Sequence, residues 1–167
     1  DDTLPYVCPP GSFGNSLSPA QQSSRGCSGS CPGGYYCPEG TVEPIPCRAG
    51  TYCRTGSASE VPCPDGTYGL LPKLVDPADC PICERGGYCS GGRLNLCPRG
   101  YYNDQVGSYD SADCEPCPAH ATTLNDGATS VDQCVCEPLY YNNATAGVNC
   151  LFCPSGTVCA ERGITID

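Results

Sequence analysis

The feature that most constrains this chain is the regular spacing of its cysteines. A sixteen-residue unit occurs twice in succession from Cys31 to Pro62, as C-x-x-G-x-Y-C-x-x-G followed by six residues that end in proline. The glycines, tyrosines and prolines of the two copies fall at matching places. A repeat this regular predicts a series of small modules rather than one globular core.

The amino-acid composition leads to the same class of protein. Val, Ile, Leu and Phe make up only about 15% of the 167 residues, and a chain below about 20% with a sizeable net charge is ordinarily disordered. The net charge here is −10. However, eighteen of the residues are cysteines, about 11% of the chain, and this density is typical of a scaffold held together by disulfides.

Dense cysteine pairing also indicates a compartment. Disulfides persist where the surroundings are oxidising, so we expect an extracellular protein that is secreted or associated with the cell surface. The sequence contains no methionine, and we expect its numbering to start at a processed N-terminus. No run of about 18 apolar residues is present, so we expect no membrane span. Eight basic residues against 18 acidic ones argue against a nucleic-acid partner.

Two cysteine spacings dominate the chain and suggest how the cysteines pair. Five residues separate four of the neighbouring pairs, and sixteen residues separate three others. Pairing each cysteine with its next neighbour uses all of them and keeps every loop local. The predicted disulfides are Cys8–Cys27, Cys31–Cys37, Cys47–Cys53, Cys63–Cys80, Cys83–Cys89, Cys97–Cys114, Cys117–Cys134, Cys136–Cys150 and Cys153–Cys159. Crossed pairing, such as Cys31–Cys47 with Cys37–Cys53, remains the alternative because sequence alone does not fix connectivity.

The fold class that follows is a small disulfide-rich protein, an elongated tandem array of short β-hairpin modules with almost no helix. Proline after cysteine fixes φ, and the glycine that follows permits positive φ, so turns dominate. No segment has the apolar periodicity of a helix. We divide the chain into a first segment with one long module (1–30), the duplicated short units (31–62), alternating long and short modules (63–135), and C-terminal modules with a tail (136–167).

Two stretches resemble a known family. The runs CPGGYYCPEGTVEPIPCRAGTYC and CPAHATTLNDGATSVDQCVCEPLYY are similar to the ephrin-receptor-like cysteine-rich repeats of protist and algal extracellular proteins. These repeats are related to the Cys-rich modules of tumour-necrosis-factor and growth-factor receptors. The resemblance implies an extended rod of disulfide-bridged hairpins and supplies no catalytic residues. His120 departs from the family pattern, because similar proteins often have asparagine there.

The sequence offers residues for three kinds of chemical site, and a simpler interpretation is favoured for each. His120 is the single histidine and has no partner nucleophile in the sequence if every cysteine is paired. The C-x-x-C spacings that begin at Cys80, Cys114 and Cys150 suit zinc, but they lie in a repeat whose spacing favours disulfides. Calcium could use the aspartates, for which we prefer turn capping. The aspartates considered are Asp76, Asp79, Asp104, Asp110, Asp113, Asp126 and Asp132. We therefore predict no catalytic residue, no metal and no cofactor.

Glycans and self-association are the expected surface features. Asn143-Ala144-Thr145 is the one N-x-[ST] sequon, so we predict an N-linked glycan on Asn143. Stretches rich in Ser, Thr and Pro at 15–30 and 55–62 could accept O-linked glycans. The tail segment Ile164-Thr165-Ile166 has β propensity and could pair with the edge of another hairpin. The residues predicted to join copies of the chain are Leu4, Tyr6, Val7, Ile164, Thr165 and Ile166.

The sequence favours a structural role, in which the chain is a subunit of a glycosylated surface coat or filament. Contacts between unlike ends produce filaments when the rotation between subunits does not close. The alternative is a receptor or adhesion module that binds a protein ligand along its side. We do not expect an enzyme.

Overall fold

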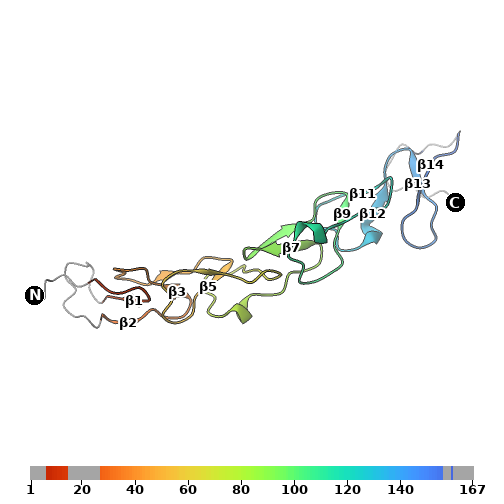
Figure 1. Cartoon of the computed structure of the whole chain (residues 1–167). Helices are drawn as coiled ribbons and strands as arrows, with labels where there is room; N and C mark the ends of the chain where they lie inside the picture. The colour runs from red at the N-terminus through yellow and green to blue at the C-terminus, as the bar shows by residue number, and fades with distance from the viewer. Residues whose placement is uncertain (1–6, 15–26, 156–158, 160–167) are drawn as a thin grey trace, which may run out of the picture. The chain divides into compact units, whose positions relative to one another are not determined.

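A computed structural model describes residues 7–14, 27–155 and Cys159. In these residues the regular structure consists of short strands that pair two by two into antiparallel hairpins (Figure 1). The pairs are β1 (Ser12–Phe13) with β2 (Gly29–Ser30), β3 (Tyr35–Tyr36) with β4 (Ile45–Pro46), β5 (Thr51–Tyr52) with β6 (Val61–Pro62), β7 (Gly87–Ser90) with β8 (Arg93–Leu96), β9 (Tyr101–Tyr102) with β10 (Glu115–Pro116), β11 (Ala121–Thr123) with β12 (Cys134–Cys136), and β13 (Tyr140–Asn142) with β14 (Cys150–Phe152).

The predicted fold class is confirmed as a small disulfide-rich, mostly β protein with tandem hairpins. Within the described residues, the helical structure amounts to three 3₁₀ turns of three residues each. These are η2 (Pro77–Asp79), η3 (Ser111–Asp113) and η4 (Val131–Gln133). Each turn ends at the residue before a cysteine, so the turn brings that cysteine back towards the start of its own module.

The structure contains nine disulfides, and each joins a cysteine to its next neighbour. All eighteen cysteines lie within the described residues and none is free. The pairs are the local ones, from Cys8–Cys27 to Cys153–Cys159. None of the crossed pairs is formed.

Sulfur takes the place of a conventional core. Fifteen of the eighteen cysteines are buried. The other buried side chains in the described part of the chain are Tyr68, Ala128, Asn103, Ser108 and Thr123. The large aliphatic residues that normally fill a domain interior are mostly exposed here, so covalent bridges stabilise the fold in place of apolar burial.

All nine modules follow one template that starts at the first cysteine of each disulfide. We name each module by that cysteine. The sixth residue after it is a cysteine in the short modules, which start at Cys31, Cys47, Cys83 and Cys153. In the long modules the same position holds a residue other than cysteine, and the first cysteine is bonded to a cysteine that lies after the hairpin loop. These residues are Gly14, Gly69, Asn103, Thr123 and Asn142.

The third residue after the first cysteine has a positive φ in every module where the structure describes it. Six of these eight positions are glycines, which adopt this conformation without a steric penalty. His120, with φ +61°, and Leu139, with φ +75°, occupy the same position. These two residues therefore adopt a backbone conformation that side chains with a Cβ rarely take.

Reciprocal backbone hydrogen bonds join several pairs of successive modules. In the Cys31 and Cys47 modules, Gly34 N–H donates to the Cys53 carbonyl over 2.8 Å, and Gly56 N–H donates to the Cys31 carbonyl over 2.7 Å. The Cys83 and Cys97 modules are joined in the same way, from Gly86 to Asn103 and from Gly107 to Cys83, both over 2.8 Å. Short and long modules thus share one connection, since Asn103 takes the place of the second cysteine.

Contacts divide the chain into two units, Asp1–Pro81 with Gly91–Arg93, and Ile82–Ser90 with Leu94–Asp167. The four modules from Cys8 to Cys63 lie in the first unit. The second holds the modules from Cys83 onward, apart from the tip of the β7–β8 hairpin. The four segments predicted from the sequence, 1–30, 31–62, 63–135 and 136–167, stay a prediction.

Candidate functional site

The C-x-x-C spacings considered for zinc join two different disulfides. Cys80 is bonded to Cys63, and Cys83 is bonded to Cys89. The spacings that begin at Cys114 and Cys150 also link neighbouring bridges. Zinc binds thiolates, so these paired cysteines act as staples in this structure.

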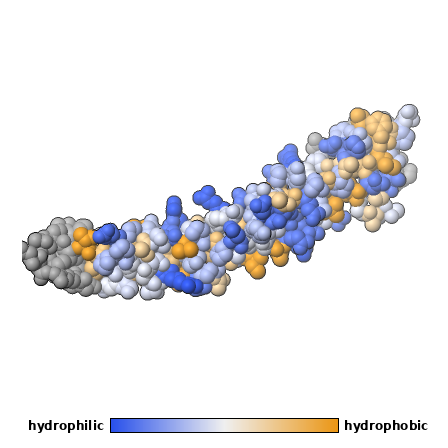
Figure 2. Space-filling model, viewed as in Figure 1, coloured by the Kyte–Doolittle hydropathy of each residue, from blue (hydrophilic) through white to orange (hydrophobic). Residues whose placement is uncertain are grey.

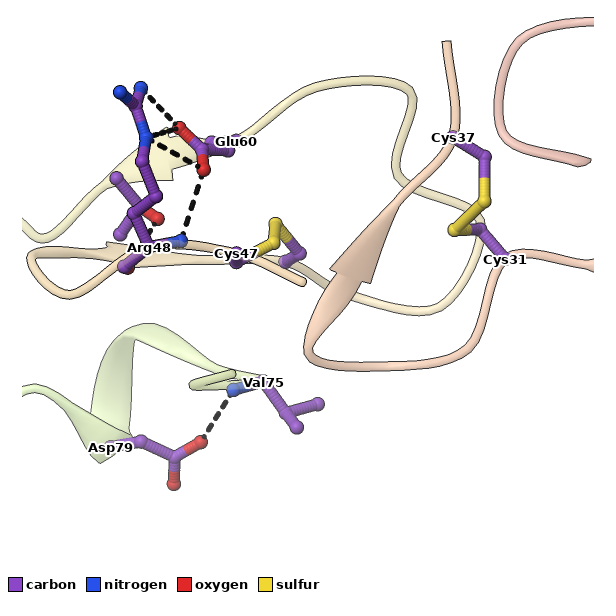
Figure 3. The surroundings of a disulfide bond; sticks show 9 residues. Cys31, Cys37, Cys47, Arg48, Glu60, Val75 and Asp79 are labelled. Carbon is purple, nitrogen blue, oxygen red and sulfur yellow. Dashed lines mark hydrogen bonds and ion pairs between the residues drawn. A yellow bond between two sulfur atoms is a disulfide. The ribbon is translucent and has the colours of Figure 1, made fainter. Parts of the chain in front are cut away.

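The aspartates of the Asp-x-Ala-Asp ends cap the 3₁₀ turns. Asp76 Oδ1 accepts a hydrogen bond from Ala78 N–H over 3.1 Å, and Asp79 Oδ2 accepts from Asp76 N–H over 2.9 Å. Asp79 Oδ2 also accepts from Val75 N–H over 3.0 Å (Figure 3). The backbone hydrogen bonds from Asp76 and Val75 lower the pKa of the Asp79 carboxyl. Asp110 and Asp113 form the same capping box around η3.

The other aspartates that could supply calcium ligands accept hydrogen bonds from groups of the protein. Asp126 Oδ1 accepts a hydrogen bond from the backbone N–H of Arg99 over 3.1 Å, and Asp104 Oδ1 accepts one from the side-chain amide of Gln105, Nε2, over 2.6 Å. Asp132 Oδ2 accepts a hydrogen bond from the Ser130 hydroxyl over 3.2 Å at the start of η4. Across the described residues, no group of three or more His, Cys, Asp or Glu side chains is arranged to hold a metal ion.

His120 is placed by its backbone and by one aromatic contact. It is exposed, and its ring stacks on Tyr140 with centroids 4.0 Å apart and planes 8° apart. Its carbonyl accepts a hydrogen bond from Glu137 N–H over 2.9 Å. The residue therefore links the Cys117 module to the Cys136 module.

An ion pair fixes the β5–β6 hairpin beside the Cys47–Cys53 disulfide. The Arg48 guanidinium donates to both carboxylate oxygens of Glu60, with the shortest distance 2.7 Å, and Arg48 N–H donates to Glu60 Oε1 over 3.0 Å (Figure 3). The Arg48 hydrogen bonds lower the pKa of the Glu60 carboxyl. Only 9% of the Glu60 side chain is exposed, whereas 81% of the Arg48 side chain is exposed. Arg48 therefore covers Glu60.

The predicted glycan acceptor, Asn143, lies exposed in the loop between β13 and β14. Its neighbour Asn142 organises this loop. Asn142 Oδ1 accepts from Ala144 N–H over 3.1 Å and from Asn149 N–H over 3.0 Å, and its Nδ2 donates to the Gly147 carbonyl over 3.1 Å. The side chain of Asn142 is therefore bonded within the loop, whereas Asn143 is exposed to solvent.

The structure describes one of the residues predicted to join copies of the chain. Val7 is 54% exposed. The others, Leu4, Tyr6, Ile164, Thr165 and Ile166, lie outside the described residues. Self-association therefore stays a prediction at this point.

Three long modules carry a groove at the same template position, between the hairpin loop and the 3₁₀ turn. The grooves have volumes of about 580, 380 and 310 Å³ in the Cys63, Cys97 and Cys117 modules. The lining residues that come from the hairpin loop are Leu70, Leu71 and Leu74 in the first, Gln105, Val106 and Gly107 in the second, and Leu124, Asn125 and Asp126 in the third. The groove of the Cys63 module is thus mainly apolar, and the other two are more polar.

Figure 2 shows hydrophobic residues as small, separate patches on a largely hydrophilic surface. The most exposed large apolar side chain among the described residues is Leu70, at 71%, and Leu71 beside it is 68% exposed. In the part of the chain that the structure describes, no helix has the length and hydrophobicity needed to cross a bilayer.

These features define a cysteine-rich module array of the extracellular type, stapled in series by local disulfides. Comparison with known proteins agrees with this class. Residues 87–134 match the family model described as tyrosine-protein kinase ephrin type A/B receptor-like, which confirms the resemblance over that part of the chain.

Two curated proteins are also similar to part of the chain. Thyroglobulin from Mus musculus and thyroglobulin from Rattus norvegicus are each 39% identical to it over 62 residues. The match covers 37% of this chain and 2% of each thyroglobulin. The chain therefore spans a very small part of the length of these relatives, and the similarity concerns the cysteine-rich repeat.

Sequence reasoning missed the buried residues that replace the second cysteine. Asn103 is 1% exposed, its Nδ2 donates to the Gly87 carbonyl over 2.9 Å, and its Oδ1 accepts from Gln105 N–H over 2.9 Å. Thr123 is 2% exposed and its hydroxyl accepts from Gly100 N–H over 3.0 Å. Aligning all the modules on their first cysteines would have drawn attention to both positions.

Proposed function

We propose that this chain is a non-enzymatic structural element of an extracellular protein, a subunit of a glycosylated surface coat or filament that assembles head to tail. The observation that carries this proposal is the repeated connection between modules. Reciprocal backbone hydrogen bonds join the Cys8 and Cys31 modules, the Cys31 and Cys47 modules, and the Cys83 and Cys97 modules. Because these bonds use main-chain groups, a further module could be added through the same connection. Disulfides hold each module closed while load is transmitted along the backbone.

The absence of enzymatic activity is part of the same proposal. His120 stacks on Tyr140, every cysteine is in a disulfide, and the capping aspartates are bonded to backbone amides. The histidine, the cysteines and the capping aspartates are therefore engaged in structural contacts. A catalytic base needs a nucleophile or substrate position within hydrogen-bond reach, and His120 has an aromatic neighbour instead.

Sedimentation of purified chain tests head-to-tail assembly. We expect large assemblies that are lost when residues 1–7 or 160–167 are removed. Because the proposed contact joins unlike ends, mixing the two truncated variants should yield discrete heterodimers, each held by the two remaining intact ends. Asp167→Asn, which alters the tail outside the predicted contact residues, serves as the control. A monomeric wild-type chain, or assemblies unaffected by both truncations, would contradict the proposal.

Glycosylation is tested separately by mass spectrometry of chain secreted from eukaryotic cells. We expect a glycan on Asn143 that disappears in Asn143→Gln and in Thr145→Ala. Asn142→Gln keeps the sequon and should keep the glycan, although it disturbs the loop. An unmodified Asn143 in the secreted wild-type chain would remove the N-linked glycan from the proposal.

A ligand-binding receptor or adhesion module is the second candidate. The observation that favours it is the pair of exposed leucines in the groove of the Cys63 module. Such a role needs a surface along the side of the modules, whereas filament assembly needs their ends. The two functions therefore make different residues important.

A further inference from the structure

The groove of the Cys63 module differs from its two counterparts in a way that the shared fold does not explain. All three grooves lie between the same loop and the same 3₁₀ turn. The Cys63 groove is the largest, at about 580 Å³, and five of its six lining residues are apolar. They are Leu70, Leu71, Leu74, Ala78 and Pro81, with Asp79 as the charged member.

The leucines are not needed to fill the interior of the module. Leu70 and Leu71 are 71% and 68% exposed, so most of their apolar surface faces solvent. The equivalent residues of the Cys97 module are Asp104 and Gln105, and that module forms the same hairpin, turn and disulfide. The template thus accepts polar residues at these positions. Adjacent exposed leucines beside a groove indicate a surface that another molecule covers.

The charges around the groove indicate what covers it. Two cationic side chains from this part of the chain are already engaged, because Lys73 Nζ lies 4.8 Å from the centroid of the Tyr35 ring and Arg54 is paired with Asp76 over 3.0 Å. Asp79 contributes a carboxylate whose pKa is lowered by backbone hydrogen bonds, so it stays charged at neutral pH. The chain as a whole carries a net charge of −10. An acidic partner, including a second copy of this chain, would meet repulsion here, whereas a basic partner is attracted.

We propose that the groove of the Cys63 module binds a basic protein segment in which a large apolar side chain stands beside a lysine or arginine. The apolar side chain packs between Leu70, Leu71 and Leu74, and the cation pairs with Asp79. This surface belongs to the fourth of the nine modules and includes none of the terminal residues predicted to join copies, so its use is independent of the end-to-end assembly proposed above. It gives the ligand-binding alternative a specific site.

The probes are three short synthetic peptides, one of alternating Leu and Lys, one of alternating Leu and Glu, and one of alternating Ser and Lys. Binding to the full chain is followed by fluorescence anisotropy and by amide shifts in NMR spectra. We expect the Leu-Lys peptide to bind most tightly and to shift the amides of residues 70–81. The Leu-Glu peptide lacks the cation and the Ser-Lys peptide lacks the apolar side chain, so both should bind at least several-fold more weakly.

Variants copied from the Cys97 module test the site itself. Leu70→Asp with Leu71→Gln should weaken the Leu-Lys peptide about tenfold or more, because the buried leucine surface is lost. Asp79→Asn should weaken it by up to about fivefold, as for one surface ion pair. Leu124→Asp changes the same template position in the Cys117 module and should leave binding unchanged. Mass spectrometry of the nine disulfides checks that every variant is folded.

Three results would overturn the proposal. The first is no binding of the Leu-Lys peptide to the wild-type chain. The second is equal binding to wild type and to the Leu70→Asp, Leu71→Gln variant, since the attraction would then be a general effect of net charge. The third is self-association of the chain that this variant abolishes, since the groove would then be covered by a second copy.

Discussion

The short and the long modules solve the same folding problem with different chemistry. In the short Cys83 module, the disulfide closes on the sixth residue, Cys89, and buries it completely. In the long Cys97 module, the disulfide reaches Cys114 beyond a 3₁₀ turn, and the sixth residue is the buried Asn103. The backbone connection to the neighbouring module is the same in both cases.

This difference shows that the position matters more than the sulfur. In the Cys97 module the sixth residue must be buried and must present its carbonyl to the preceding module. Asn103 meets this need because its side-chain amide is satisfied by two hydrogen bonds to backbone groups. The long module then has a loop between the hairpin and the turn, and this loop is where the sequence varies between modules.

Removal of one disulfide from each kind of module gives the largest expected effect. Cys97→Ala with Cys114→Ala opens a bridge of sequence separation 17, and Cys83→Ala with Cys89→Ala opens one of separation 6. From loop-closure entropy we expect the free energy of unfolding to fall by about 3 kcal/mol in the first case and about 2 kcal/mol in the second. Urea unfolding measures both. A larger loss from the short bridge would show that local packing outweighs loop length.

Truncation of the residue that replaces the second cysteine comes next. Asn103→Ala leaves the Gly87 carbonyl and the Gln105 N–H without their partner, so we expect a loss of about 2 kcal/mol. Asn142→Ala is the matched control, because Asn142 occupies the same template position but is only half-buried. Its loss should be about 1 kcal/mol. Equal losses in urea unfolding would contradict the role assigned to burial.

Alanine at the shared glycine position separates backbone strain from module packing. Gly86 and Gly100 have φ of +87° and +84°, so alanine is strained at both. A Cβ at Gly86 would collide with the Gly127 carbonyl oxygen, whereas at Gly100 the nearest atom is Thr122 Oγ1 at 3.7 Å. Gly86→Ala should therefore cost about 1 kcal/mol more than Gly100→Ala in thermal unfolding. Equal losses of stability in the two variants would mean that the segment around Gly127 moves away from Gly86 at little cost in free energy.

The 3₁₀ turn of the long modules gives the smallest effect, one that depends on pH. The pKa of Asp79 is lowered from its ordinary 3.8, so its hydrogen bonds to Asp76 and Val75 contribute fully above that value. They are lost as the pH falls through the lowered pKa. We expect the protection of the Val75 and Asp76 amides against hydrogen exchange to decrease as the pH falls below 3.8 and through the lowered pKa of Asp79. The amides of the short modules should show no matching change.

Asp79→Asn provides the control for this prediction. Asparagine keeps an oxygen that can accept the same hydrogen bonds but has no charge to titrate. Protection of Val75 and Asp76 should then be independent of pH. A pH dependence that persists in Asp79→Asn would contradict the role assigned to the Asp79 carboxylate.

Much of the fold followed from cysteine spacing alone. The repeats of five and sixteen residues between cysteines favoured local pairing, and the turn residues around them favoured short hairpins. Turn capping was preferred for the aspartates, and the structure shows Asp76, Asp79, Asp110 and Asp113 as caps. The roles of Asn103 and Thr123 were not predicted. A buried polar residue is recognised by what surrounds it, and the sequence gives no sign of those neighbours.

The sequence by itself determined the fold class, because disulfides and turns depend on residues close together in the chain. It also contained the contrast between Leu70-Leu71 and Asp104-Gln105. Only the tertiary structure decided that these pairs occupy equivalent grooves, that His120 stacks on Tyr140, and that Gly86 must be glycine to admit Gly127 from two modules further on. These facts depend on contacts between separate modules, and such contacts are fixed by the geometry of the backbone connection.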